Sequence, residues 1–147
     1  NEKLQLTAVQ SLGCWGAEVP EAIVTHCLHH PGQSYRLAGL QLLEFRSHLL
    51  TDHQLLDYCN EALNDFRDSV VIAAVRIIQR RDSKEICKRL FCLCQEDSDE
   101  VAFTALRALS CIASENSKRY LLKLSKTLKS ESRRLLTQKK LNEQFRS

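Results

Sequence analysis

Glycine, proline and aromatic residues are scarce in this sequence. Its 147 residues include 4 Gly and 2 Pro, only 6% are aromatic, and there is no Met. β-Sandwiches and barrels need many tight turns, which Gly and Pro usually supply, so their scarcity argues against an all-β fold. No Gly or Pro follows Gly39. Later turns must therefore use Asp, Ser, Asn and Thr, and the segments between them are free to form helices.

Long hydrophobic runs are also lacking. No apolar stretch approaches the ~20 residues that span a bilayer, and no basic segment followed by an apolar one marks a secretory signal. The chain is 44% hydrophobic and 27% charged, which argues against disorder. We expect one folded domain over residues 1–147, with no membrane partner. Because Met is missing even at position 1, we expect this domain to be a fragment of a longer chain.

The seven cysteines do not follow the pattern of a disulfide framework. Their number is odd, and most lie inside apolar helical patterns rather than in turns. Cys27, Cys59, Cys87 and Cys111 are expected to be small buried residues, as free cysteines usually are. This usage is typical of a reducing compartment and predicts an intracellular protein, in the cytoplasm or the nucleus.

A short apolar core recurs along the chain. Copies begin at Ala8, Gly39, Ala74 and Ala105, with a weaker fifth at Thr137, so the interval is 31 to 35 residues. This period is typical of a two-helix repeat. In the cores, apolar or small residues recur at the spacing that places them on one face of a helix. The small residue that begins each of the first four cores would let a neighbouring helix approach closely.

Four further apolar-periodic segments lie between these cores, so the sequence predicts an all-α fold of about nine helices. Short polar side chains mark the expected helix starts, where they can accept hydrogen bonds from free N–H groups. The expected starts of the intervening helices are capping boxes of Thr51 with Gln54 and of Asp82 with Glu85, and a cap at Asn116 or Ser117. The core-bearing helices are expected to start after Ser34, Asp68 and Ser98-Asp99.

The segment Ala8-Val9-Gln10-Ser11-Leu12-Gly13-Cys14-Trp15-Gly16 resembles the Ala-x-x-x-Leu-Gly-x-x-Gly ending of the second helix in HEAT repeats, especially the short HEAT-like repeats of phycobilisome lyases. Asp68-Ser69-Val70 and Asp99-Glu100-Val101 are similar to that family's Asp-x-Val start of the same helix. The resemblance implies a right-handed α-solenoid of about four and a half two-helix repeats, whose second helices line a concave face. Residues 117–147 would form a basic terminal repeat.

The net charge of +3 hides an uneven distribution. Residues 1–116 hold 11 Lys plus Arg and 16 Asp plus Glu, whereas residues 117–147 hold 10 basic residues and 2 acidic ones. A basic end predicts an anionic partner, and phosphates would be held there by salt-sensitive contacts. The alternative is a polar cap that keeps the end of the solenoid soluble. The candidate anion-binding residues are Arg119, Lys123, Lys126, Arg133, Arg134 and Lys140.

A second candidate surface follows from the third position of each core. This position is occupied by Gln10, Gln41, Arg76, Arg107 and Lys139. If the second helices are parallel neighbours, these side chains form a row, which Arg36, Arg80 and Arg81 would extend. The predicted partner-binding residues are Gln41, Arg76, Arg80, Arg107 and Lys139. Their partner would present an acidic segment or a nucleic-acid backbone. Alternatively, these are ordinary polar positions of amphipathic helices.

Metal and catalytic chemistry have little support in the sequence. His26 with His29 or His30 has a spacing that could share a metal, but only Cys14 offers a third ligand nearby. A solvated helix end explains the same histidines. No His is followed by Glu, and no phosphate loop or nucleophile elbow occurs. We therefore predict no enzyme, no metal, no cofactor and no small-molecule substrate.

The sequence as a whole favours a HEAT-like scaffold or adaptor that binds another protein through its concave face. The alternative is a protein that binds nucleic-acid backbones through the row and the basic end. Both hypotheses place the function in surface charge, since no motif for catalysis is present.

Overall fold

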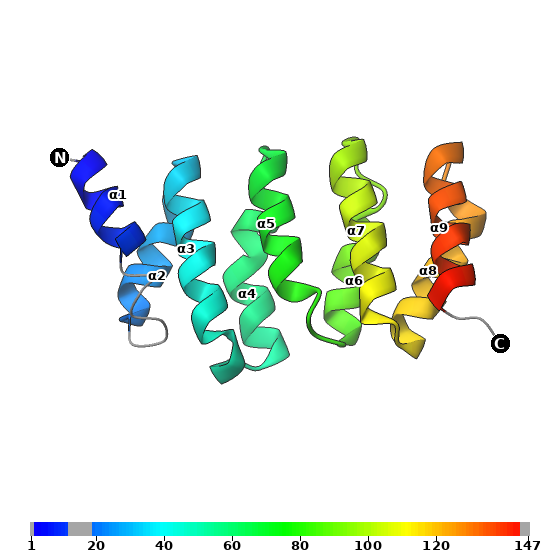
Figure 1. Ribbon diagram of the computed structural model, residues 1–147, viewed down its shortest axis with the longest axis horizontal. Coiled ribbons are helices and arrows are strands. Elements are labelled where there is room, and N and C mark those ends of the chain that lie inside the picture. The colour runs from blue at the N-terminus through cyan, green and yellow to red at the C-terminus, as the bar shows by residue number, and fades with distance from the viewer. Residues whose placement is uncertain (1, 12–18, 145–147) are drawn as a thin grey trace. The chain divides into compact units, whose positions relative to one another are not determined.

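The chain is all-helical wherever its structure is described, which confirms the all-α class. The structure is a computed structural model that describes residues 2–11 and 19–144, and those residues contain no strand. The helices of this part, shown in Figure 1, are α1 (Glu2–Ser11), α2 (Glu21–His29), α3 (Gln33–Arg46), the short 3₁₀ helix η2 (Ser47–Leu49), α4 (Asp52–Leu63), α5 (Asp68–Ile78), α6 (Lys84–Leu93), α7 (Asp99–Ile112), α8 (Glu115–Thr127) and α9 (Glu131–Gln144).

The helices group into two compact units, which divide between Ile77 and Ile78. In the first, called here the N-terminal unit, α2 packs along α3 and beside α4. In the second, the C-terminal unit, α6 pairs with α7 and α8 pairs with α9. There α6 also lies beside α8 and α7 beside α9, so this unit has two layers of helices (Figure 1). The first and second helices of the predicted repeat therefore form separate layers in the C-terminal unit.

Polar caps begin two helices as the sequence predicts. Thr51 precedes α4 in a capping box: its hydroxyl accepts from Gln54 N at 3.2 Å, and its own N–H donates to Gln54 Oε1 at 2.9 Å. Ser98 caps α7, because its hydroxyl accepts from Val101 N at 3.3 Å. α5 begins at Asp68 itself, one residue earlier than expected. Such caps satisfy N–H groups that a helix end leaves without partners.

Two other predicted caps are wrong. α6 does not begin with a capping box of Asp82 and Glu85, because Ser83 takes the cap position and its hydroxyl accepts the N–H three residues further on, at 3.3 Å. α8 begins after Ser114 rather than after the residues predicted for it. The hydroxyls of Ser114 and Ser117 each accept the other's backbone N–H, at 3.1 and 2.9 Å. A search for Ser or Thr followed by Glu or Gln overlooks a capping box built from two serines.

Two helix ends do not have the type of residue usually found there. α3 begins at Gln33 rather than after Ser34, and the preceding residue, Gly32, has no side chain with which to cap it. α7 ends at Ile112, and the residue that follows, Ala113, has the left-handed backbone conformation with φ of 52° and donates its N–H to Leu109 O. Glycine normally occupies this position because it has no Cβ to clash. Since no glycine follows Gly39, alanine adopts that conformation here.

The cysteines divide between the core and the surface. Cys27, Cys59 and Cys87 are buried, as predicted. Burial raises the pKa of the Cys59 thiol to about 12, so this thiol stays protonated at neutral pH. Cys111 is exposed, and the prediction that it is buried is wrong. It lies four residues after the exposed Arg107 on α7 and therefore shares the exposed face of that helix.

The close helix approach predicted at the core positions occurs at Gly39. A Cβ atom placed there would lie 2.9 Å from Cys27 Cβ, 3.0 Å from Leu28 N and 3.1 Å from Cys27 C. The last two atoms belong to the backbone of α2, which cannot move without repacking the unit. Ala74 and Ala105 are fully buried at the equivalent core positions. The small residues therefore serve the packing of the helices.

We expect Gly39→Ala to lower the free energy of unfolding by about 1–3 kcal/mol, because the added methyl group overpacks α2 against α3. The higher helix propensity of alanine, worth about 1 kcal/mol, opposes this loss. Urea unfolding followed by circular dichroism measures the difference. The control is Gln41→Ala on the exposed face of the same helix, expected to change stability by less than about 0.5 kcal/mol. A Gly39→Ala variant as stable as the wild type would contradict the close packing.

Candidate interaction surfaces

A buried ion cluster joins neighbouring helix pairs in the N-terminal unit. Asp65, in the turn between α4 and α5, has a side chain with 0% exposure. Its Oδ2 accepts from Arg36 Nη1 at 2.8 Å, and its two oxygens accept from Arg67 Nε and Nη2 at 2.9 Å. The hydrogen bonds from Arg67, and the one from Arg36, hold the pKa of the Asp65 carboxyl at about 2. We call Arg36, Asp65 and Arg67 the N-terminal clamp.

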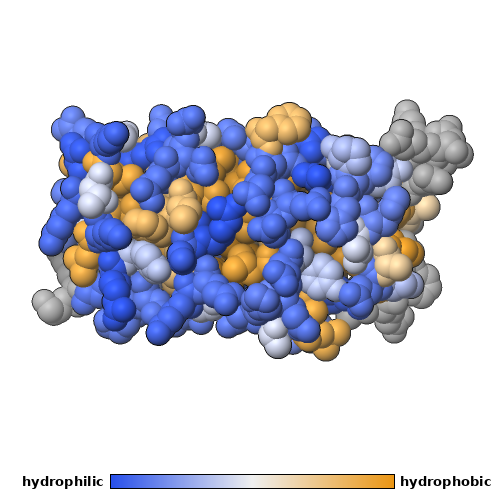
Figure 2. Space-filling view, turned by 180° about the vertical axis from the view of Figure 1, so that it is seen from behind, coloured by the Kyte–Doolittle hydropathy of each residue, from blue (hydrophilic) through white to orange (hydrophobic). Residues whose placement is uncertain are grey.

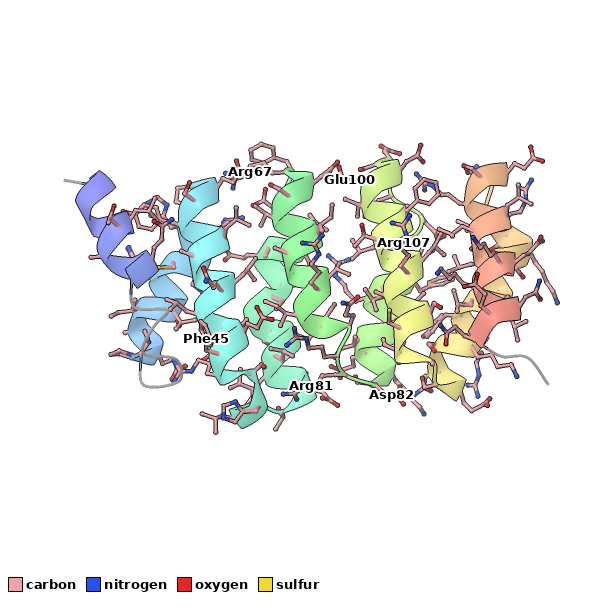
Figure 3. The ribbon with its side chains drawn as sticks, in the orientation of Figure 1. Phe45, Arg67, Arg81, Asp82, Glu100 and Arg107 are labelled. Atoms are coloured by element: carbon pink, nitrogen blue, oxygen red, sulfur yellow. The ribbon has the colours of Figure 1, made fainter. Side chains whose placement is uncertain are left out.

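The two arginines of the N-terminal clamp also bind the turn between α2 and α3. Arg36 Nε donates to His30 O at 2.8 Å, and Arg67 Nη2 donates to Pro31 O at 3.0 Å. Arg67 lies beside the first turn of α5 (Figure 3). The side chain of Arg36 is only 16% exposed. It therefore does not extend the predicted partner-binding row, and the expectation that it would is wrong.

Arg133 on α9 makes a similar cluster in the C-terminal unit. Its Nη1 donates to the carbonyls of Cys94 and Glu96 at 3.2 and 2.7 Å, and its Nη2 donates to Asp97 O at 3.2 Å. Its Nε and Nη2 also donate to Asp99 Oδ1, at 3.1 and 2.8 Å. These acceptors lie at the end of α6, in the following turn and at the start of α7. We call Arg133 and its four acceptor residues the C-terminal clamp.

Arg133 is therefore not a solvated anion-binding residue, and that prediction is wrong. Its side chain is 10% exposed, and all three of its guanidinium nitrogens already donate. The adjacent Arg134 donates from Nη1 to the carbonyls of Leu128 and the next residue, at 2.6 and 3.0 Å, and so binds the end of α8. Lys140 Nζ lies 3.5 Å from Glu143 Oε2 on the same helix. These three cations of α9 have partners within the unit.

The three candidate cations of α8 remain at the surface. Arg119, Lys123 and Lys126 are all exposed. Lys123 Nζ lies 5.2 Å from the ring centroid of Phe91 on α6, and the rings of Phe91 and Tyr120 are 5.0 Å apart. Sequence reasoning missed Phe91, because only the packing of α6 beside α8 brings it to these cations. The C-terminal unit as a whole holds 16 Lys plus Arg and 9 Asp plus Glu.

The predicted partner-binding row lies at the surface of both units. Its members are all exposed: Gln41 on α3, Arg76 on α5, Arg80 just after α5, Arg107 on α7 and Lys139 on α9. Within the C-terminal unit, α7 and α9 are neighbours, and Arg107 extends from the middle of α7 (Figure 3). On α9, a shallow hollow is lined by Leu135, Gln138 and Lys139 among others. The structure thus places four row residues on exposed positions of α3, α5, α7 and α9, and Arg80 on an exposed position after α5.

The histidines at the C-terminal end of α2 have protein partners. The His30 ring stacks on Tyr35 with centroids 3.9 Å apart, and His29 Nδ1 lies 2.7 Å from Glu61 Oε1. In residues 2–11 and 19–144, no group of three or more His, Cys, Asp or Glu side chains is placed to hold a metal ion. Cys14, the third ligand considered from the sequence, lies outside the described residues.

Comparison with protein families and with curated proteins identifies no relative of this chain. No protein-family model matches the chain, and no curated protein gives a significant match. Within the described ranges, no helix is both long and apolar enough to cross a membrane. The fold therefore defines an all-α protein, and its function has to be argued from the surfaces described above.

Proposed function

We propose that the chain is a HEAT-type α-solenoid segment that binds another protein through the row of Gln41, Arg76, Arg80, Arg107 and Lys139. The observation that carries the proposal is the exposure of single polar residues within buried stretches of the second helices. Arg76 is exposed between the buried Val75 and Ile77. Arg107 is likewise exposed between two buried residues of α7. The helix therefore places each arginine on its solvent-facing side, where the guanidinium is accessible to a partner.

The solenoid is supported by the sequence distance that the long-range side-chain contacts span. Gln33 Nε2 donates to Ser69 Oγ, 36 residues away, in the N-terminal unit. In the C-terminal unit, Arg133 reaches the carboxylate of Asp99, 34 residues away. Both distances are close to one period of the predicted repeat. Contacts limited to the next repeat are what a stack of repeats requires.

The row fits an acidic protein segment. Arg76 and Arg107 each present a planar guanidinium, which can bind a carboxylate through two parallel hydrogen bonds. Lys139 adds a third cation on α9. A nucleic-acid backbone is the second candidate partner, and the excess of 16 basic over 9 acidic residues in the C-terminal unit favours it.

A labelled poly-glutamate peptide tests the row. We expect the intact chain to bind it at low salt, and the triple variant Arg76→Ala, Arg107→Ala, Lys139→Ala to bind about tenfold more weakly, as loss of three charge-assisted contacts implies. Fluorescence anisotropy measures both affinities. The matched control is the triple variant Lys84→Ala, Lys88→Ala, Lys129→Ala, which removes the same charge from exposed positions outside the row.

Equal loss in both triple variants would contradict a site in the row, since net charge alone would then explain the binding. Duplex DNA distinguishes the second candidate. An affinity that falls with log salt at a slope near −0.9 per phosphate, and that the row variant abolishes, would replace the protein partner with a nucleic acid.

A further inference from the structure

The exposed side of α8 carries a cationic stripe in which three of the candidate anion-binding residues lie around an exposed leucine. Arg119, Leu122, Lys123 and Lys126 are spaced as i, i+3, i+4 and i+7, so they share one face of the helix. All four are exposed, whereas Leu121 and Leu124 on the opposite side are fully buried. No carboxylate occurs between Glu115 and Glu131. The stripe therefore presents three positive charges with no acid on the helix beyond its first residue.

An apolar side chain sits among these charges. Leu122 is 45% exposed, although it lies on a helix whose other leucines Leu121 and Leu124 are in the core. Seen from behind, the surface is mainly hydrophilic with small hydrophobic areas among the polar residues (Figure 2). Exposure of a leucine side chain to water is unfavourable. A partner that carries its own apolar group can bury this side chain and so gain binding free energy.

We propose that this stripe, Arg119, Leu122, Lys123 and Lys126, binds an acidic protein segment in which a leucine-type side chain is flanked by carboxylates. Such a segment matches the stripe in both respects, with carboxylates on the three cations and the apolar group on Leu122. This inference goes beyond the proposed function, because it assigns a partner to a first helix of the C-terminal unit and uses none of the row residues.

The aromatic residues beside the stripe favour a protein over a single-stranded nucleic acid. Base stacking needs an aromatic ring with a free face. The Phe91 ring is covered by the Lys123 ammonium at 5.2 Å and lies against Tyr120 at 5.0 Å. Both rings are only half-exposed. Phe91 contacts Lys123 through a cation–π interaction, and Tyr120 packs against Phe91, so the rings support the stripe.

A labelled synthetic peptide of alternating Glu and Leu tests the stripe in the intact chain. We expect Arg119→Gln with Lys126→Gln to weaken binding of this peptide at least tenfold. Leu122→Ala is expected to weaken it severalfold, while leaving the affinity for poly-glutamate unchanged. The charge-matched control, Lys84→Gln with Lys129→Gln, removes two exposed cations outside both the stripe and the row and should leave binding of the Glu-Leu peptide within twofold of wild type. Circular dichroism confirms that every variant is folded.

Three outcomes would overturn the proposal. The first is equal weakening by the stripe variant and the charge-matched control, which would mean binding by net charge. The second is an unchanged affinity in Leu122→Ala, because the apolar half of the match would then be absent. The third is tighter binding of oligothymidine than of the Glu-Leu peptide with loss in the stripe variant, which would assign the stripe to nucleic acid. None of these depends on whether the row binds poly-glutamate, so the two proposals fail separately.

Discussion

Replacing Arg133 by leucine is expected to lower the free energy of unfolding of the C-terminal unit by about 3 kcal/mol. The variant removes the guanidinium that the carbonyl oxygens of Cys94, Glu96 and Asp97 share. Asp99 loses less, because its side chain is 68% exposed and can bind water instead. Urea unfolding followed by circular dichroism gives the stability, with unchanged helical content in the absence of urea showing that the variant folds.

The adjacent arginine provides a matched control for this prediction. Arg134→Leu makes the same change of charge and size one residue away, but gives up only two hydrogen bonds at the end of α8, so about 1 kcal/mol is expected. Arg133→Lys keeps the charge but loses the planar guanidinium with its several N–H donors. Its loss of unfolding free energy should lie between the losses of the two leucine variants. Equal losses in Arg133→Leu and Arg134→Leu would show that the clamp contributes no more than an ordinary surface arginine.

The helical class could be predicted because it depends on local patterns. Apolar residues at helical spacing, and the absence of Gly and Pro after Gly39, hold for each segment by itself. The positions of helix starts were less predictable, since several polar residues compete at each turn. Asp82 and Ser83 are both good caps, and the structure selects Ser83. When two adjacent residues both favour the N-cap position, the packing of the turn decides which of them caps the helix.

The roles of individual charged residues depend on packing between helices that are distant in the sequence, which composition does not encode. Arg133 and Arg134 are adjacent and chemically identical, so the sequence predicted both to be available to anions. Their positions around α9 differ by one residue, and this points only Arg133 into the turn between α6 and α7. No pattern in the sequence assigns a role to Asp65. Its role follows from Arg36, 29 residues earlier, which no local pattern connects to it.

The buried carboxylate of Asp65 makes the stability of the N-terminal unit depend on pH in the acid range. Its pKa is about 2 in the folded chain, against an ordinary value of 3.8. Below the ordinary value the unfolded chain binds the proton more readily, so acid favours unfolding. The contribution of this group is therefore complete above about pH 4 and is lost as the pH falls towards about 2. The difference between the two pKa values corresponds to about 2 kcal/mol.

Asp65→Asn is expected to destabilise the unit by about 3 kcal/mol near neutral pH, since it leaves the guanidinium groups of Arg36 and Arg67 without their buried counter-charge. The same variant should lose the part of the acid dependence that Asp65 supplies, so its stability curve is expected to be flatter than that of the wild type below about pH 4. Urea unfolding over a pH series measures both effects. The matched control is Asp57→Asn, because that carboxylate is 74% exposed and its ion pair with the exposed His53, at 3.5 Å, is at the surface. It should follow the wild-type curve within about 0.5 kcal/mol. If the free energies of unfolding of the wild type and Asp65→Asn fell equally with pH below about pH 4, the N-terminal clamp would not hold this carboxyl in its charged form.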